Sequence, residues 1–386
     1  MRVLIDGTPL SAGGGVQAAI ALLVGLRATR DVDWRAVMSA PTREALGATL
    51  AGDDRVSFVR KDGWRDVRAI NRALHGAERA FKPDVVFTVF GPAYFRACAP
   101  HVCGFARPRM IYGGGRVRDF VARGAGPTPH WEAQPPGPTS FWDILRARSL
   151  RRMDHVIVET EIAAERVIAR LGIARQRVSV IANGVNPLLM DFMPGVTIET
   201  GRRVVLVPSA YYQHKNLEII PAIAQALSQF EPELDFEFRL TLDAGSTDWS
   251  GIARDAARRG VGCRVVTAGV LSLPALAAAY EAACVVMLPS LMEISTAVYP
   301  EAFHMQRPLV TSDRAFARAA CADAAVYADP RDAGAFARAV QSVLRDQDQR
   351  ARLIAAGRVR LAAAYPSPGE KFTAQMALLL RVAGRA

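Results

Sequence analysis

The chain has 386 residues, of which 51% are hydrophobic, 22% charged and 8% aromatic. This length suits two α/β domains better than one, and the apolar stretches are too short or too interrupted by charge to span a bilayer. The net charge of +11 leaves an anionic lipid surface and a general bias toward arginine as explanations, whereas a nucleic-acid partner is disfavoured because no recognisable binding module is present.

The first apolar run, residues 2–6, is interpreted as a buried strand and not as a signal peptide, so we expect a cytoplasmic protein. Short apolar runs predict buried strands, and longer stretches with apolar residues on one face predict helices. A run of three glycines, Gly13 to Gly15, follows the first strand. In the first half of the chain the predicted strands are 2–6, 34–38, 56–59, 85–89, 102–105, 156–159 and 178–181, and the predicted helices fall within 16–24, 65–80, 141–152 and 161–171.

Residues 113–140 interrupt this alternation with many glycines and prolines, which predicts a long loop. The composition of this segment favours neither of two interpretations, a functional loop or a surface insertion. Between residues 107 and 152, nine arginines face three acidic residues, which favours an anionic surface or substrate nearby.

A stretch with two prolines at 186–200 is interpreted as an interdomain linker, and the alternation then restarts. The second series predicts strands 204–207, 237–242, 264–267, 285–288, 309–311 and 325–327, with helices within 217–229, 250–259, 272–283, 333–346, 348–364 and 368–382 and another that opens near residue 300. We therefore predict two Rossmann-like, doubly wound parallel-sheet lobes, 1–190 and 191–366, with a final helix in 367–386 that packs back on the first lobe.

Two common nucleotide-binding motifs are missing from this pattern. No GxGxxG motif follows the first strand, which disfavours a nicotinamide dehydrogenase, and no GxxxxGK[ST] motif indicates a P-loop kinase. The five cysteines and six histidines show no metal-ligand spacing, so we predict no metal site and expect the cysteines to be buried and reduced.

The most informative segment follows the predicted strand 285–288. Pro289 and Ser290 open a loop of small residues that leads into a helix with Glu301 in its first turn. Carboxyl ends of parallel strands and helix N-termini suit phosphate groups, because free N–H groups and the helix dipole favour negative charge there. Glu293 and Glu301 flank the loop and can accept hydrogen bonds from ligand hydroxyls, although an ordinary helix acid and a solvent-exposed acid would give the same spacing.

Together, these residues make the pattern Pro-Ser-x-x-Glu, seven residues and a second Glu. It resembles the signature of the retaining group 1, or family 4, glycosyltransferases of GT-B fold. Further stretches resemble the same family in the right order along nearly the whole chain: Gly13-Gly14-Gly15-Val16, Ile181-Ala182-Asn183-Gly184-Val185, Pro208 to Asn216, Ala268-Gly269-Val270 with Leu276 and Tyr280, Arg307-Pro308-Leu309-Val310-Thr311-Ser312, and Ala322-Asp323-Ala324-Ala325 with Asp329-Pro330. The resemblance implies a cleft between the lobes and a nucleotide-sugar donor bound to the second lobe.

The resemblance also implies roles for the residues at matching positions. Glu301 would bind the ribose hydroxyls of the donor, Glu293 the transferred sugar and Lys215 the diphosphate, which makes Glu293 and Lys215 the catalytic candidates. The other donor-binding candidates are the N–H groups of Ser295, Thr296, Ala297 and Val298 at the diphosphate, Gly269 and Val270 beside the nucleobase, and Ser209 and Asn216 near Lys215.

In the first lobe, the resemblance places Gly14 and Gly15 where the backbone can approach donor and acceptor closely. Many relatives carry a histidine after the strand that corresponds to 102–105, and Ala106 stands there in this chain. His101 and Arg107 are the remaining candidates for sugar contacts in that lobe.

The predicted function is retaining, metal-independent hexosyl transfer from a UDP-, GDP- or dTDP-sugar to a saccharide, with the donor as co-substrate and no cofactor. We expect a lipid-linked acceptor of O-antigen, capsule or lipopolysaccharide synthesis. Peripheral attachment to the inner face of a bacterial inner membrane is left open. Two alternative functions also stay open: a sugar-nucleotide 2-epimerase and a non-catalytic nucleotide-binding partner of another transferase.

Overall fold

The structure, a computed structural model, describes the chain except for residues 12, 62–65, 94, 113–140, 193–200 and 385–386. The chain divides into two compact units, which we call the first and the second lobe. Among the described residues, the first lobe contains those up to 112, 141–186 and 366–384, and the second contains 187–192 and 201–365. The loop predicted at 113–140 and part of the predicted linker lie outside the described residues.

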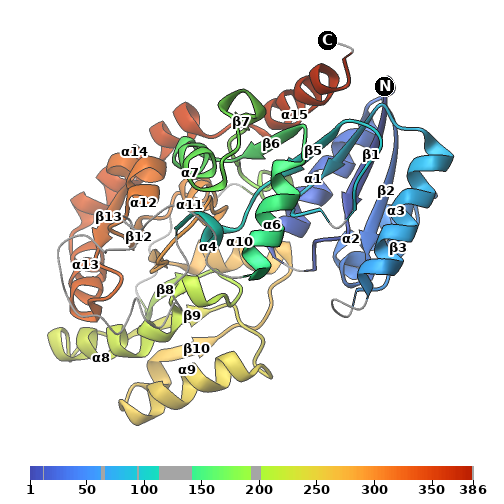
Figure 1. The fold of residues 1–386 in the computed structure, drawn as a ribbon. Coiled ribbons are helices and arrows are strands. Elements are labelled where there is room, and N and C mark those ends of the chain that lie inside the picture. Colours follow the sequence, from blue (N-terminus) through green and yellow to red (C-terminus); the bar gives the residue numbers. More distant parts are fainter. Residues whose placement is uncertain (12, 62–65, 94, 113–140, 193–200, 385–386) are drawn as a thin grey trace. The chain divides into compact units, whose positions relative to one another are not determined.

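The first lobe is built on a parallel sheet of seven strands in the order β3-β2-β1-β4-β5-β6-β7 (Figure 1). The chain starts in the middle of the sheet, moves outward through β2 and β3, and then returns to extend the other side from β4, which is a doubly wound arrangement. The strands are β1 (Arg2–Gly7), β2 (Asp33–Ser39), β3 (Val56–Val59), β4 (Val85–Thr88), β5 (His101–Gly104), β6 (His155–Val158) and β7 (Val178–Val180).

Alternate residues of these strands pack on opposite faces of the sheet. Val3 and Ile5 of β1 belong to a core cluster with the apolar residues of α1 and α15, whereas Leu4 packs with those of α3 on the other face. Because helices cover both faces, most residues of the central strands are apolar and buried. The helices of this lobe are α1 (Gly14–Ala28), α2 (Arg43–Ala51), α3 (Val67–Phe81), α4 (Pro108–Tyr112), α6 (Phe141–Arg151), α7 (Glu161–Leu171) and α15 (Pro368–Val382).

The second lobe repeats this plan with a six-stranded parallel sheet in the order β10-β9-β8-β11-β12-β13 (Figure 1). One face carries a core cluster formed by residues of α8, α9 and α13 against the sheet. The strands are β8 (Arg203–Val207), β9 (Phe236–Leu240), β10 (Val265–Thr267), β11 (Val285–Leu288), β12 (Leu309–Ser312) and β13 (Ala325–Ala328). The helices are α8 (Ile220–Phe230), α9 (Thr247–Arg258), α10 (Leu273–Ala282), α11 (Val298–His304), α12 (Ala315–Cys321), α13 (Ala333–Arg345) and α14 (Gln347–Ala364).

The final helix, α15, belongs to the first lobe although it follows the second in sequence. Ser367 and Glu370 form a capping box at its start, which satisfies N–H groups that the helix itself leaves unbonded. Lys371 donates hydrogen bonds to Glu159 Oε1 at 3.2 Å and to Asn183 Oδ1 at 2.8 Å. The helix is therefore tied to the first sheet by polar contacts as well as by its apolar face.

The prediction of two doubly wound parallel-sheet lobes is confirmed. Each predicted strand is present with ends that shift by at most about two residues, as is usual for strand and helix boundaries. Three short helices, α2, α4 and α12, were not predicted. Within the described residues, no helix combines the length and the hydropathy that a membrane span requires.

We expect Gly104→Ala to destabilise the first lobe. Gly104 lies in β5, and a Cβ atom there would be 1.9 Å from the carbonyl oxygen of Val89. Relief of this clash requires a backbone shift, so the free energy of unfolding should fall by about 3 kcal/mol in urea titrations followed by circular dichroism. The matched control is Gly76→Ala in α3, where a Cβ has no heavy atom within 4 Å and should leave stability unchanged or raise it by up to about 1 kcal/mol. Equal stabilities of the two variants would contradict this packing.

Candidate functional site

The candidate site lies at the carboxyl ends of the central strands of the second sheet. β8 and β11 are neighbours, but the chain leaves β8 toward β9 on one side and leaves β11 toward β12 on the other. The loops after these two strands, 208–216 and 289–297, therefore begin side by side where the strand order reverses, the position at which doubly wound sheets bind ligands.

An ion pair joins these two loops. Lys215 Nζ lies 2.6 Å from Glu293 Oε1, and Ser290 Oγ donates a second hydrogen bond to the same oxygen at 2.7 Å. The side chains of Lys215 and Glu293 are only 12% and 5% exposed. The structure thus brings the two predicted catalytic residues together as a largely buried pair.

The loop around Lys215 is held by Asn216 and by a backbone contact. Asn216 Nδ2 donates to the carbonyl oxygens of Pro289 at 3.2 Å and Pro330 at 2.7 Å, and Leu291 N–H donates to the carbonyl of His214 at 2.7 Å. Asn216 has a φ of 58°, a left-handed conformation that asparagine adopts more readily than most residues. Asn216 therefore fixes the loops that follow β8, β11 and β13, which positions Lys215 for Glu293.

Glu301 occupies the fourth position of α11 and is buried. Its Oε2 accepts a hydrogen bond of 2.9 Å from the hydroxyl of Tyr280 in α10. Burial raises the pKa of the Glu301 carboxyl, and the Tyr280 hydrogen bond only partly offsets this. Burial and the neighbouring carboxyl also raise the pKa of Tyr280 well above its ordinary value, so the phenol stays a hydrogen-bond donor.

The loop that precedes α11 contains the predicted diphosphate-binding residues. Thr296 is buried, Ser295 and Ala297 are partly exposed, and Val298 is the first residue of the helix. Val298 N–H lies 3.4 Å from Thr296 Oγ1, and Glu301 N–H bonds the carbonyl of Ala297 at 3.0 Å. These residues begin two positions after Glu293, so they lie on the same loop after β11.

The remaining donor-binding candidates lie at the same edge of the sheet. Ser209 is buried after β8, and its N–H donates to Thr241 Oγ1 at 3.0 Å. Gly269 follows β10 with a φ of 76°, which suits glycine, and its N–H donates to Thr267 Oγ1 at 3.2 Å. Val270 is 80% exposed, so an apolar side chain faces solvent beside this edge.

The first-lobe candidates lie on the other sheet and do not form one group. Gly14 and Gly15 open α1. His101 is the first residue of β5 and is buried, with Nε2 2.8 Å from Thr88 Oγ1, and burial lowers its pKa to about 4. Arg107 follows β5 and donates to a carbonyl oxygen of the loop after β4 at 3.3 Å.

Two residues that donate hydrogen bonds to Glu293 and Glu301 were not proposed as site residues from the sequence. Ser290 lies in the Pro-Ser pattern, and Tyr280 lies in a stretch that resembles the glycosyltransferase family, so motif membership was the available signal. Within the part of the chain that the structure describes, no group of three or more His, Cys, Asp or Glu side chains is placed to hold a metal ion.

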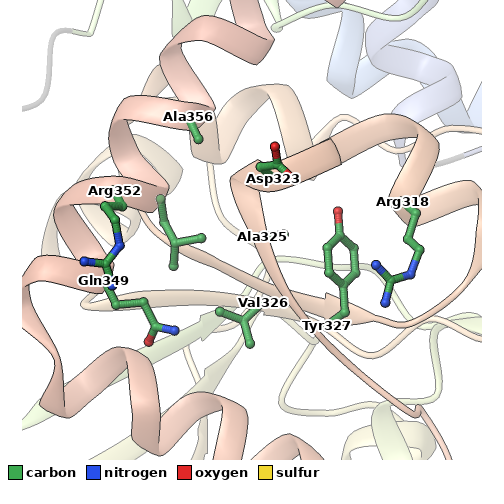
Figure 2. Close-up of a pocket in the computed structure, with 9 residues that line it drawn as sticks. Arg318, Asp323, Ala325, Val326, Tyr327, Gln349, Arg352 and Ala356 are labelled. Carbon is green, nitrogen blue, oxygen red and sulfur yellow. The ribbon is translucent and has the colours of Figure 1, made fainter.

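A cavity of about 560 Å³ in the second lobe lies away from the candidate residues. Figure 2 shows it between the start of β13 and α14, with Tyr327, Arg318 and Arg352 among its walls. None of the predicted site residues lines it. Its position on the outermost strand separates it from the loops after β8 and β11.

Two family models match consecutive parts of the chain. Residues 12–187 match the model described as "Glycosyltransferase Family 4", and residues 202–346 match "Glycosyl transferases group 1". The second match contains every candidate of the second lobe, and the first contains those of the first lobe. No curated protein sequence matches the chain.

Solved structures share the fold over nearly the whole chain. A glycosyltransferase from Rickettsia africae has a TM-score of 0.69 at 12% identity, with 100% of this chain and 99% of that chain covered. HepE from Anabaena, in complex with UDP-glucose, has a TM-score of 0.73 at 15% identity, with 98% and 100% covered. TarM from S. aureus, in complex with fondaparinux, α-GlcNAc-glycerol and UDP, has a TM-score of 0.69 at 12% identity, with 98% and 99% covered.

We expect loss of either member of the Lys215–Glu293 pair to cost more than loss of both. Lys215→Met leaves a buried carboxylate without its cation, which should lower the free energy of unfolding by about 3 kcal/mol, whereas the double variant with Glu293→Gln should regain most of this loss. Urea unfolding of wild type, both single variants and the double variant gives the coupling. Additive losses would mean that the pair contributes no interaction of its own.

Glu301→Gln should stabilise the ligand-free protein at neutral pH. Burial raises the pKa of Glu301 above its ordinary value of 4.5, so the native state binds this proton more tightly than the unfolded chain does. The stabilisation of the native state by this proton is complete below the pKa that Glu301 has in the unfolded chain. It is lost as the pH rises through the pKa of Glu301 in the native state. Glutamine keeps an oxygen for Tyr280 without a charge, so we expect a gain of about 1 kcal/mol at pH ~7 that disappears near pH ~4.5. Urea unfolding across this range tests it, and a variant that is less stable than wild type at neutral pH would refute it.

Proposed function

We propose that the chain, a glycosyltransferase of GT-B fold whose two lobes match family models, is a retaining, metal-independent enzyme that moves a hexosyl group from a nucleotide-sugar to a saccharide acceptor. The proposal depends above all on the buried pair of Lys215 and Glu293 between the loops after β8 and β11. A cation, two buried acids and a helix start at one sheet edge can bind a ligand that carries both a diphosphate and several hydroxyls.

The donor contacts follow from the chemistry of each group. Glu301 would accept hydrogen bonds from the ribose hydroxyls, and Glu293 from hydroxyls of the transferred sugar. Lys215 would donate to the diphosphate, together with the N–H groups of the Ser295–Val298 segment. An ammonium group has three N–H donors, so Lys215 can keep its bond to Glu293 while it donates to a phosphate oxygen. Val270, exposed beside Gly269, supplies an apolar surface for the nucleobase.

Catalysis in this proposal comes from the positive charge of Lys215 beside the leaving diphosphate. As the bond between the anomeric carbon and the diphosphate breaks, negative charge grows on the diphosphate, and Lys215 stabilises it more in the transition state than before. This cation supplies the positive charge that a divalent metal supplies in other enzymes, which supports metal independence.

Retention of configuration is proposed without an enzymic nucleophile. The acceptor hydroxyl would attack the anomeric carbon on the face from which the diphosphate departs. Its proton would pass to a phosphate oxygen of the leaving nucleotide, so that the products are the glycoside and the nucleoside diphosphate. Glu293 then acts by binding the sugar.

For the donor we propose a UDP-sugar first, with GDP- and dTDP-sugars as the further candidates. HepE, which is similar in fold, was solved in complex with UDP-glucose, and TarM in complex with UDP. For the acceptor we propose a lipid-linked saccharide of a bacterial surface polysaccharide. The arginine excess between residues 107 and 152 supports this acceptor and a peripheral place at the inner face of the inner membrane.

In the first lobe we propose that Gly14, Gly15 and Arg107 face the acceptor and the sugar. Arg107 follows β5 directly after Ala106, which stands where many relatives have a histidine. His101 is buried against Thr88, so its contribution would be to position the sheet and not to contact the sugar.

Glu301→Ala tests the donor site. Loss of two charge-assisted hydrogen bonds to the ribose should weaken UDP binding about 100-fold or more in titration calorimetry. The matched control is Glu281→Ala, which removes an exposed carboxylate from α10 of the same lobe and should leave the affinity unchanged. Unchanged binding of UDP-, GDP- and dTDP-sugars by the Glu301 variant would contradict the assignment.

The products of the reaction separate transfer from its alternatives. NMR of the product formed from donor and a synthetic lipid-linked acceptor should show the anomeric configuration of the donor. Epimerised sugar nucleotide from donor alone would instead indicate a 2-epimerase, and binding without turnover would indicate a non-catalytic partner.

A further inference from the structure

The first turns of α6 expose an unusual run of large apolar side chains. Phe141, Trp142, Ile144 and Leu145 are 66%, 60%, 45% and 40% exposed. The rings of Phe141 and Trp142 also contact each other, with centroids 5.7 Å apart and edge to face. Scattered exposed apolar residues are ordinary, but a continuous patch marks a surface that binds a partner.

The opposite face of α6 is anchored to the first lobe. Ala147 and Leu150 are buried, and Ser149 Oγ donates to the carbonyl of Ala93 at 2.9 Å. The apolar patch therefore lies on a helix whose other side is packed into the lobe, which gives it a defined position.

Basic residues surround the other end of the same helix. Arg148, Arg151 and Arg152 are exposed, and the acidic residue of the helix, Asp143, is paired with Arg146 at 2.9 Å. A helix with aromatic and aliphatic side chains at one end and exposed arginines at the other is typical of a segment that lies in a membrane interface. Among the described helices, none is able to span a bilayer, so the patch fits a surface contact.

We propose that α6 docks the protein on an anionic bilayer by hydrophobic insertion. Phe141, Trp142, Ile144 and Leu145 enter the boundary between headgroups and acyl chains, while Arg148 and Arg152 contact headgroup phosphates. Electrostatic attraction by the arginine-rich segment alone would disappear at high salt, whereas insertion of four apolar side chains persists. Docking depends on the proposed function only in that a lipid-linked acceptor gives a reason for it.

Vesicle co-sedimentation of the full chain tests the insertion. The probes are vesicles of phosphatidylcholine and of phosphatidylcholine mixed with phosphatidylglycerol, each at low and high salt. Phe141→Ser combined with Trp142→Ser should weaken binding to the anionic vesicles about 100-fold or more at both salt concentrations, since burial of each aromatic side chain contributes roughly a tenfold step or more. Arg148→Ala combined with Arg152→Ala should weaken binding only to the anionic vesicles and only at low salt.

A matched control is Val359→Ser, which changes a side chain of α14 that is 71% exposed and should leave vesicle binding unchanged. All changed residues are exposed, so the variants should unfold at the wild-type temperature. Trp142 should also report directly, because a blue shift of fluorescence with vesicles should be present in wild type and reduced in Trp142→Phe.

Docking by α6 is overturned if wild type does not bind the anionic vesicles, or if the Phe141 and Trp142 double variant binds as wild type does. It is also overturned if light scattering shows that wild type is a dimer that the same double variant dissociates, because the patch would then join two copies of the chain.

UDP titration of each protein distinguishes the docking proposal from the proposed transferase function. UDP binding without vesicle binding removes docking alone, and vesicle binding without UDP binding removes the proposed transferase function alone.

Discussion

The ion pair of Lys215 and Glu293 is the contact on which the geometry of the candidate site depends. It joins residues 78 positions apart in the chain and links the loops that follow the neighbouring strands β8 and β11. Removal of two charges from water is costly, and their attraction offsets this only when the geometry is close and further hydrogen bonds are made, as Ser290 does here. The pair therefore specifies the spacing of the two loops, because any other spacing would leave a buried charge without its partner.

The two acids of the motif have different surroundings, which supports different roles for them. Glu293 faces a cation, whereas Glu301 receives its hydrogen bond from the neutral hydroxyl of Tyr280. Burial raises the pKa of Glu301, so its charge is unfavourable until further donors reach it. Hydroxyl groups of a ligand would be such donors and would favour the ionised carboxyl. The charge of Glu301 is thus unfavourable when the site is empty and hydrogen-bonded when a ligand fills it. This behaviour is typical of a residue retained for binding and not for stability.

The sequence predicted the strands well because parallel sheets that are covered on both faces need continuous apolar runs. The missed helices are those too short for a helical period to be visible. α4 has five residues, α12 has seven, and Gly47 interrupts α2 with a φ of 65°. The loops of the candidate site could be proposed from the sequence because each follows a strand, so strand ends and motif spacing coincide. The contacts within the site depend on how strands from distant parts of the sequence pair, so neither the pairing of Lys215 with Glu293 nor that of Tyr280 with Glu301 follows from spacing alone.

Among the described residues, the chain leaves the first lobe after Asn186 and returns to it at Pro366, and one glycine explains why these two points lie together on that lobe. The first lobe ends at Asn186 and resumes at Pro366. A Cβ atom on Gly184 would lie 2.3 Å from the carbonyl oxygen of Pro366, so only glycine lets the returning segment pass so near. The Lys371 contacts with Glu159 and Asn183 then fix the start of α15 beside the same segment. The Asn-Gly-Val stretch that precedes the predicted linker therefore has a packing reason within the first lobe: its glycine leaves room for the backbone at Pro366, where the chain returns to that lobe.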